Sequence, residues 1–154
     1  MEFDYALERI TPTLFEEVSP LIESHYQEIA HYKDIELDPD WDTYARLAEV
    51  NALRAFTCRV RETDQLIGYA VYVLRNNLHY KSSLQAVQDV LFVDKDHRGR
   101  GGKFLLWCDL QLKEEGVQVV YHHVKHNHNF GPLLERLGYE LIDHIYAKRL
   151  DLWR

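Results

Sequence analysis

Apolar residues follow helical spacing in the first third of the 154-residue chain. They fall on one face of two predicted helices, over residues 11–31 and 40–50. Thr11 or Thr13 is a suitable N-cap for the first helix, and Asp40 is one for the second. A β-rich run over residues 3–10 predicts a strand before both helices.

The middle of the chain changes to the spacing of strands. Residues 54–62 and 66–75 are β-rich runs joined by a short polar turn, which predicts a hairpin, and residues 84–93 predict another strand. A basic, glycine-rich stretch, "DHRGRGGK" at residues 96–103, then leads into a predicted helix over residues 104–116, whose last residue is a glycine.

The last third predicts a strand over residues 117–125, a short helix over 130–138 and a final strand over 139–150. The resulting order is β-α-α-β-β-β-α-β-α-β. It predicts an α/β (α+β) fold with a mixed, mostly antiparallel central sheet and helices on both faces. No repeat, linker or low-complexity segment interrupts the pattern, so residues 1–154 are expected to form a single domain.

Composition and charge narrow the range of partners. Apolar residues make up 46% of the chain and charged residues 28%, as in ordinary globular proteins, and the net charge is −7. A negative chain is a poor match for nucleic acid, and no apolar run approaches the ~18 residues that span a membrane. Cys58 and Cys108 are expected to be buried, reduced thiols, with one disulfide as the alternative. We therefore expect a cytoplasmic protein with neither nucleic acid nor a membrane as a partner.

The glycine-rich stretch has the chemistry of an anion site. Glycines allow backbone N–H groups at a helix N-terminus to converge on one point, where the helix dipole favours an anion such as a pyrophosphate. Arg98, Arg100 and Lys103 add positive charge. The spacing fits neither the P-loop nor the dinucleotide-binding pattern. A flexible turn with solvated charges would also explain these residues, so the loop alone leaves both interpretations open.

In its context this loop resembles the phosphate loop of the GNAT superfamily of acyl-CoA N-acyltransferases, [QR]-x-x-G-x-[GA], between a strand and a helix. Arg98 and Gly101 match the pattern. Lys103 stands where the family has Gly or Ala, and Gly102 lies one position early. The resemblance covers nearly the whole chain, and the layout is also similar to small phage and prophage members.

A second family pattern, N-x-x-A-x-x-x-Y-x-x-x-G-[FY], matches further along at Asn127, Gly138 and Tyr139. Phe130 replaces its Ala, and Leu134 replaces the Tyr that usually protonates the departing thiolate. The role of that Tyr cannot be carried over to this chain. Tyr139 or Tyr121 is a candidate replacement, and departure of the thiolate without an acid is the alternative.

The resemblance implies a fold of the GNAT type and acetyl-CoA as co-substrate, with no metal. It also implies two groups of residues that bind the co-substrate. Backbone N–H groups of Leu91, Phe92 and Val93 would polarise the thioester carbonyl. The pyrophosphate and its surroundings would be held by Arg98, Gly99, Arg100, Gly101, Gly102, Lys103 and Asn127.

Direct attack on a thioester needs a neutral amine. Removing a proton from an alkyl amine of pKa about 10.4 at pH 7 costs about 4–5 kcal/mol, whereas a thiolate of pKa about 8.5 needs only about 2 kcal/mol of help. A general base therefore matters more than a general acid. The candidates are Asp89, expected on the same strand face as Leu91 and Val93, and His25 and Glu28 on the first helix. For each, a structural or solvated role is the competing interpretation.

Two other clusters carry weaker signals. The histidines of "YHHVKHNHN", residues 121–129, lack a familiar metal-ligand spacing, and we expect no metal there. Acidic residues between the two first helices, residues 34–42, would attract a cationic amine, but a solvated loop is the favoured interpretation.

The sequence therefore predicts an N-acetyltransferase that transfers the acetyl group of acetyl-CoA to a primary amine by direct attack in a ternary complex. The alternative is a catalytically silent GNAT-like domain that binds CoA or a protein partner. The acceptor is expected to be a small-molecule, peptide or protein amine, and a homodimer is left open.

Overall fold

A computed structural model describes residues 1–154 and contains the first nine predicted elements in their predicted order. A short 3₁₀ helix, η1, is added before the third α-helix. The elements are β1 (Phe3–Glu8), α1 (Pro12–Ile29), α2 (Trp41–Glu49), β2 (Leu53–Val60), β3 (Leu66–Asn76), β4 (Leu84–Val93), η1 (Lys95–Arg100), α3 (Gly101–Glu114), β5 (Val119–Tyr121) and α4 (Gly131–Arg136).

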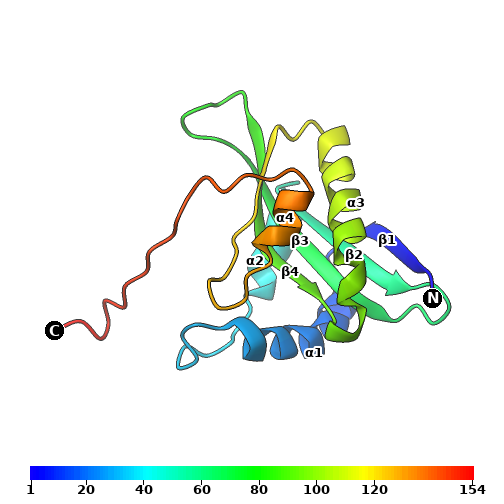
Figure 1. Ribbon diagram of the computed structural model, residues 1–154, viewed down its shortest axis with the longest axis horizontal. Coiled ribbons are helices and arrows are strands. Elements are labelled where there is room, and N and C mark those ends of the chain that lie inside the picture. The colour runs from blue at the N-terminus through cyan, green and yellow to red at the C-terminus, as the bar shows by residue number, and fades with distance from the viewer.

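The five strands form one sheet in the order β1-β2-β3-β4-β5. The first four are antiparallel neighbours, and β5 runs parallel to β4. Helices α3 and α4 cover one face, and α1 and α2 cover the other (Figure 1). The predicted mixed, mostly antiparallel sheet with helices on both faces is confirmed.

Two apolar clusters hold these layers together. Phe56, Tyr72 and Phe104 are fully buried between the sheet and α3, and Leu14 and Val18 of α1 pack with the other face of the sheet. Both cysteines are buried and free, as expected from the sequence. None of the helices is long and apolar enough to cross a membrane.

The pairing of strand β4 with its two neighbours is interrupted along its length. Val90 pairs with Val71 and Gln88 pairs with Tyr72, which leaves Asp89 without a partner in a β-bulge. On its other side, β4 pairs with β5 only through residues 85–87. From Gln88 onward the two parallel strands separate.

Two boundaries differ from the sequence predictions. Helix α3 begins at Gly101 rather than at residue 104, so the glycine-rich stretch forms the end of η1 and the first turn of α3 instead of an open loop. Strand β5 is limited to Val119–Tyr121 instead of residues 117–125.

The predicted final strand, residues 139–150, is wrong for the single chain. This segment extends away from the rest of the molecule (Figure 1), and residues 140–149 take part in no backbone–backbone hydrogen bond. Its residues alternate as in a strand, but a strand forms only where another strand offers a matching edge. No such edge is paired with it here.

Candidate active site

The open part of β4 lies at the centre of the candidate site. Leu91, Phe92 and Val93 pair with β3 on one side and have no strand on the other. Along an antiparallel pair, successive N–H groups point alternately to the partner and away from it, so β4 presents free backbone donors toward the gap. This is the arrangement expected for donors that polarise a carbonyl.

The N-terminus of α3 lies at the end of this open strand. Arg100, at the N-cap position, makes no side-chain hydrogen bond to the first turn, so that turn has no side-chain cap. A Cβ on Gly101 would meet only Val93 Cγ2, at 4.0 Å, and a Cβ on Gly99 would meet nothing within 4 Å. Gly99 is exposed and leaves room for a ligand beside the start of α3, whereas Gly101 is buried and its N–H donates to the carbonyl of Arg98.

Gly102 has a different role from these two glycines. A Cβ at this position would lie 3.1 Å from Leu133 Cδ1, so Gly102 is where α3 approaches α4. The family pattern has its small residue one position later, where this chain has Lys103. In this chain the small residue therefore lies one position earlier, at the point where α3 packs against α4.

The basic side chains of the loop point in two directions. Arg98 Nη2 donates to both carboxylate oxygens of Glu28 on α1, each at 2.7 Å, and Nε donates to the carbonyl of Val93 at 3.2 Å. Arg98 thus ties the end of β4 to α1, on the face of the sheet opposite α3.

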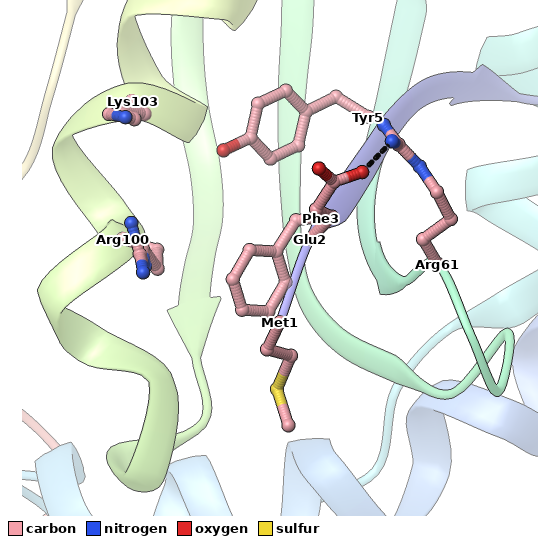
Figure 2. Close-up of a pocket in the computed structure, with 7 residues that line it drawn as sticks. All are labelled: Met1, Glu2, Phe3, Tyr5, Arg61, Arg100 and Lys103. Atoms are coloured by element: carbon pink, nitrogen blue, oxygen red, sulfur yellow. Dashed lines mark hydrogen bonds and ion pairs between the residues drawn. The ribbon is translucent and has the colours of Figure 1, made fainter.

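Arg100 and Lys103 lie across a hollow from β1 instead (Figure 2). They line a hollow of about 300 Å³ together with Phe3 and Tyr5, and the Arg100 guanidinium carbon lies 5.7 Å from the centroid of the Phe3 ring. In the same hollow Arg61 is paired with Glu2. The three loop cations therefore surround the start of α3 rather than converge on one point.

Asp89 lies on the other side of β4 from the position expected for it. Leu91 and Val93 pack with the α3 cluster, whereas the Asp89 carboxylate accepts a 2.5 Å hydrogen bond from the Tyr44 hydroxyl of α2. The expectation that Asp89 shares a strand face with Leu91 and Val93 is wrong, because the bulge interrupts the alternation of side chains. The carboxylate is exposed near α2.

Tyr44 is a site residue that the sequence showed only as part of an apolar helix face. Burial raises the pKa of its hydroxyl, and so does its hydrogen bond to Asp89, so Tyr44 remains a donor at neutral pH. Tyr44 and Tyr69 line the same apolar hollow between α1, α2 and the sheet, and the Tyr69 hydroxyl has no hydrogen-bond partner there.

The two candidates on α1 lie near the Arg98 side of the site. Burial lowers the pKa of His25 to about 4 against an opposing effect of Glu28, and its ring centroid is 5.0 Å from that of Phe92. His25 is therefore neutral at pH 7 and a weak base. Glu28 is held by Arg98, which neutralises its charge.

Tyr139 belongs to a polar cluster between β5, α3 and α4. Its hydroxyl donates to Asp109 Oδ1 at 2.6 Å, and its ring lies edge to face with His122 at 5.1 Å. His122 Nδ1 is 2.7 Å from Gln88 Oε1, at the point where β4 and β5 separate. Burial raises the pKa of Tyr139 and of Asp109, and it lowers the pKa of His122 to about 4.

Leu134 occupies the position of the family's Tyr and is buried. Asp109 and Gln88 were missed from the sequence, because their partners lie 30 and 34 residues away in the chain. The only sequence signal for Asp109 is a carboxylate next to the buried side chains of Cys108 and Leu112 on α3.

The remaining candidates lie at the surface. Asn127 is exposed in the turn closed by the Lys125–His128 bridge. His123 and His126 are exposed as well. No group of three or more His, Cys, Asp or Glu side chains is placed to hold a metal ion. In the acidic connection, two carboxylates have structural partners: Asp34 pairs with Arg149, and Asp40 caps α2.

An open strand edge on β4 and a helix N-terminus without a side-chain cap at its end are the two backbone features that the resemblance to acyl-CoA N-acyltransferases implies. Residues 15–139 match the acetyltransferase (GNAT) family, and the chain belongs to that family. No curated protein matches the chain by sequence.

Solved structures share the fold over nearly the whole chain. A ribosomal-protein-alanine N-acetyltransferase from Brucella melitensis biovar Abortus 2308 has 20% identity and a TM-score of 0.72, covering 97% of this chain and 100% of that one. An aminoglycoside acetyltransferase from an uncultured soil metagenomic sample, solved with sisomicin, has 15% identity and a TM-score of 0.71 and covers 96% of each chain. A predicted acetyltransferase from Clostridium acetobutylicum, solved with acetyl-CoA, has 14% identity and a TM-score of 0.69 and covers 97% of each.

Two partly buried histidines, His25 and His122, predict a loss of stability in mild acid. His25 and His122 have lowered pKa values in the folded state, so the unfolded chain binds protons that the folded chain does not as the pH falls below about 6.5. The free energy of unfolding should fall between pH 7 and 5 by at most roughly 1–2 kcal/mol for each histidine. Urea denaturation across this range measures the slope.

The matched variants are His25→Gln and His122→Gln, and His79→Gln, at an exposed position, is the control. Each of the first two should flatten the pH dependence, and the control should leave it unchanged. A slope that is the same in all four proteins would contradict the assignment.

Proposed function

We propose that this protein transfers an acetyl group from acetyl-CoA to a primary amine by direct attack in a ternary complex, with residues 1–154 acting as one domain. The observation that carries the proposal is the open stretch of β4, residues 88–93, which leads into the uncapped first turn of α3. It offers donors for a carbonyl and donors for a phosphate in one continuous backbone segment.

The residues at the start of α3 fit the pyrophosphate of CoA. The helix dipole favours an anion at the start of α3, and Gly99 is exposed with open space where a Cβ would lie, whereas Gly101 is buried and donates its N–H to the carbonyl of Arg98. A bound phosphate would compete with Glu28 for Arg98. The proposal therefore gives Arg98 two partners, Glu28 before co-substrate binds and a phosphate oxygen afterwards, which frees the Glu28 carboxylate.

Asp89 is the proposed general base. It is exposed and carries no cationic partner, whereas Glu28 is paired with Arg98 and His25 is a weak base. Tyr44 orients the carboxylate through one oxygen and leaves the other free to accept a proton from the amine. Removing the proton from the acceptor amine at pH 7 costs about 4–5 kcal/mol, so deprotonation of the amine is the step that most needs catalysis.

The departing thiolate needs no dedicated acid in this proposal. Leu134 cannot donate a proton, and the Tyr139 proton is directed at Asp109. Departure as the free thiolate, of pKa about 8.5, costs only about 2 kcal/mol relative to the thiol at pH 7, and the thiolate then takes up a proton from the solvent. Two structural neighbours are named for acceptors of different size, ribosomal-protein alanine and aminoglycosides. The chemical group that such acceptors share is an amine, which is the acceptor class we propose here.

The first test is release of free thiol from acetyl-CoA in the presence of a panel of primary amines: alkyl amines, polyamines, aminoglycosides and peptides with free N-termini. We expect thiol release that depends on the amine and a product that carries one acetyl group by mass spectrometry. Binding of CoA, measured by calorimetry, without amine-dependent thiol release would support the silent domain instead.

Asp89→Asn tests the general base. The asparagine oxygen can still accept from Tyr44, so the variant keeps the contact and removes the proton acceptor. We expect kcat to fall by about 10²–10⁴-fold near pH 7 with an unchanged Kd for CoA. The defect should shrink as the pH approaches about 10, where the amine is neutral without a base.

Asp42→Asn is the matched control, since Asp42 is an exposed carboxylate on the same helix as Tyr44. It should retain the wild-type pH profile. A constant ratio of wild-type to Asp89→Asn rates at every pH would show that Asp89 is not the base.

Gly101→Val tests the phosphate site. Gly101 is buried, and a β-branched side chain there would extend beyond the Cβ position toward Val93 and displace the start of α3 from the end of β4, so the Kd for CoA should rise at least tenfold. Gly101→Ala is the control for folding, because its Cβ makes only an ordinary contact with Val93. Wild-type affinity in a Gly101→Val protein with an unchanged melting temperature would move the phosphate site elsewhere.

A further inference from the structure

The apolar hollow between α1, α2 and the sheet contains one polar group that has no partner. Three hydroxyls line this hollow, on Tyr44, Thr57 and Tyr69. The Tyr44 hydroxyl donates to Asp89, and the Thr57 hydroxyl donates to Glu8. The Tyr69 hydroxyl has no hydrogen-bond partner, although Tyr69 is only 3% exposed. A buried hydroxyl without a partner is unfavourable, so a group that enters the hollow and bonds to Tyr69 is favoured.

The rest of the hollow is apolar and small. Every other side chain that lines it is aliphatic or aromatic, and no Asp, Glu, Lys, Arg or His is among them. Its volume of about 40 Å³ has room for about three non-hydrogen atoms. A charge without a partner is costly in such surroundings. The hollow therefore fits a short neutral group and disfavours a cationic one.

The hollow adjoins the proposed general base. Tyr44 lines it and bonds to Asp89, and Val90, the next residue of β4 after Asp89, lines it as well. Burial raises the pKa of the Tyr69 hydroxyl, and so does the nearby Tyr44. Tyr69 is therefore a protonated donor at neutral pH. A molecule bound at Asp89 can place a substituent in the hollow, within reach of this donor.

We propose that the hollow binds the substituent of the acceptor amine, and that this substituent is a short alkyl chain carrying a neutral oxygen, as in an amino alcohol. This inference rests on the proposed acetyl transfer. The amine lies at the free carboxylate oxygen of Asp89, and the oxygen of the substituent accepts a hydrogen bond from Tyr69. Tyr69 is then a specificity residue that takes no part in proton transfer. An alkyl amine would leave its hydroxyl unpaired, and a diamine would bring a charge into an apolar site.

Matched acceptors test this specificity. Amino alcohols of two to five carbons are compared with alkyl amines in which a methyl group replaces the hydroxyl, and with diamines in which an amino group replaces it. Rates are corrected for the fraction of neutral amine. We expect one amino alcohol to have a kcat/KM at least about tenfold above those of its two analogues. Equal kcat/KM values for the three classes at every chain length would overturn the proposal.

Tyr69→Phe removes only the hydroxyl. We expect kcat/KM for the preferred amino alcohol to fall at least about tenfold, whereas kcat/KM for its alkyl analogue should not fall. Tyr80→Phe is the control, since Tyr80 is 67% exposed and lies outside the hollow, and it should keep the wild-type preference. A purely structural role of the Tyr69 hydroxyl would change both rates alike. That result, or a preference that Tyr69→Phe retains, would contradict the assignment.

Binding measurements separate this inference from the proposed function. Calorimetry with the amino alcohols and their alkyl analogues needs no turnover. Binding that prefers the amino alcohol and is lost in Tyr69→Phe, without acetyl transfer, would support the ligand site and overturn the proposed function. Acetyl transfer to amines without any preference for the oxygen would leave the function standing and overturn the specificity. Neither binding nor transfer with any amine would overturn both.

Discussion

The parting of β4 and β5 is the constraint on which the rest of the site depends. Only residues 85–87 of β4 pair with β5, and a side-chain contact between Gln88 and His122 follows where the ladder stops. Tyr139 packs on His122 from the α4 side and is itself held by Asp109. This partly buried polar cluster holds the two strands at the point of separation, because a polar network with satisfied partners admits few other arrangements.

The positions of the site residues after Gln88 follow from the gap between β4 and β5. The bulge at Asp89 comes one residue later, so a carboxylate that strict alternation would direct toward α3 meets Tyr44 of α2 instead. The next residues of β4 present free N–H groups, and η1 then delivers the chain to the first turn of α3. A base candidate on one side of the strand and an anion site at its end are thus consequences of one interrupted ladder.

The pair between Arg98 and Glu28 connects the two sides of this gap. Both side chains are partly exposed, at 40% and 29%, and an ion pair of that kind contributes only about 0–1 kcal/mol to stability. Replacing the Glu28 carboxylate at Arg98 by another anion therefore costs little free energy. An arginine held this way keeps α1 against the loop without binding it so tightly that a phosphate could not replace the carboxylate.

The features that the sequence could predict are those set by neighbouring residues. Thr11 caps α1, and the glycines after α3 and α4, Gly116 and Gly138, adopt positive φ angles of 86° and 92°. The glycine-rich stretch misled the boundary prediction because Gly101 adopts ordinary helical angles, with φ −54° and ψ −38°. Glycine serves there by leaving space, a property that a backbone preference does not reveal.

Contacts across the fold could not be predicted in the same way. Arg98 and Glu28 are 70 residues apart, and Tyr44 and Asp89 are 45 apart. Each pair depends on which helix covers which end of β4. The one-residue bulge at Asp89 brings Asp89 and Tyr44 together, and no local pattern around "VQDVLF" predicts this bulge.

The two strands that fall short of their predicted length have a common physical cause. Residues 117–125 and 139–150 both alternate as strands, yet β5 holds three residues and the second segment holds none. Pairing is mutual, because each backbone group of an edge strand is stabilised only by the strand beside it. Alternation along the sequence shows which residues can form a strand, and only a neighbouring strand decides which of them do.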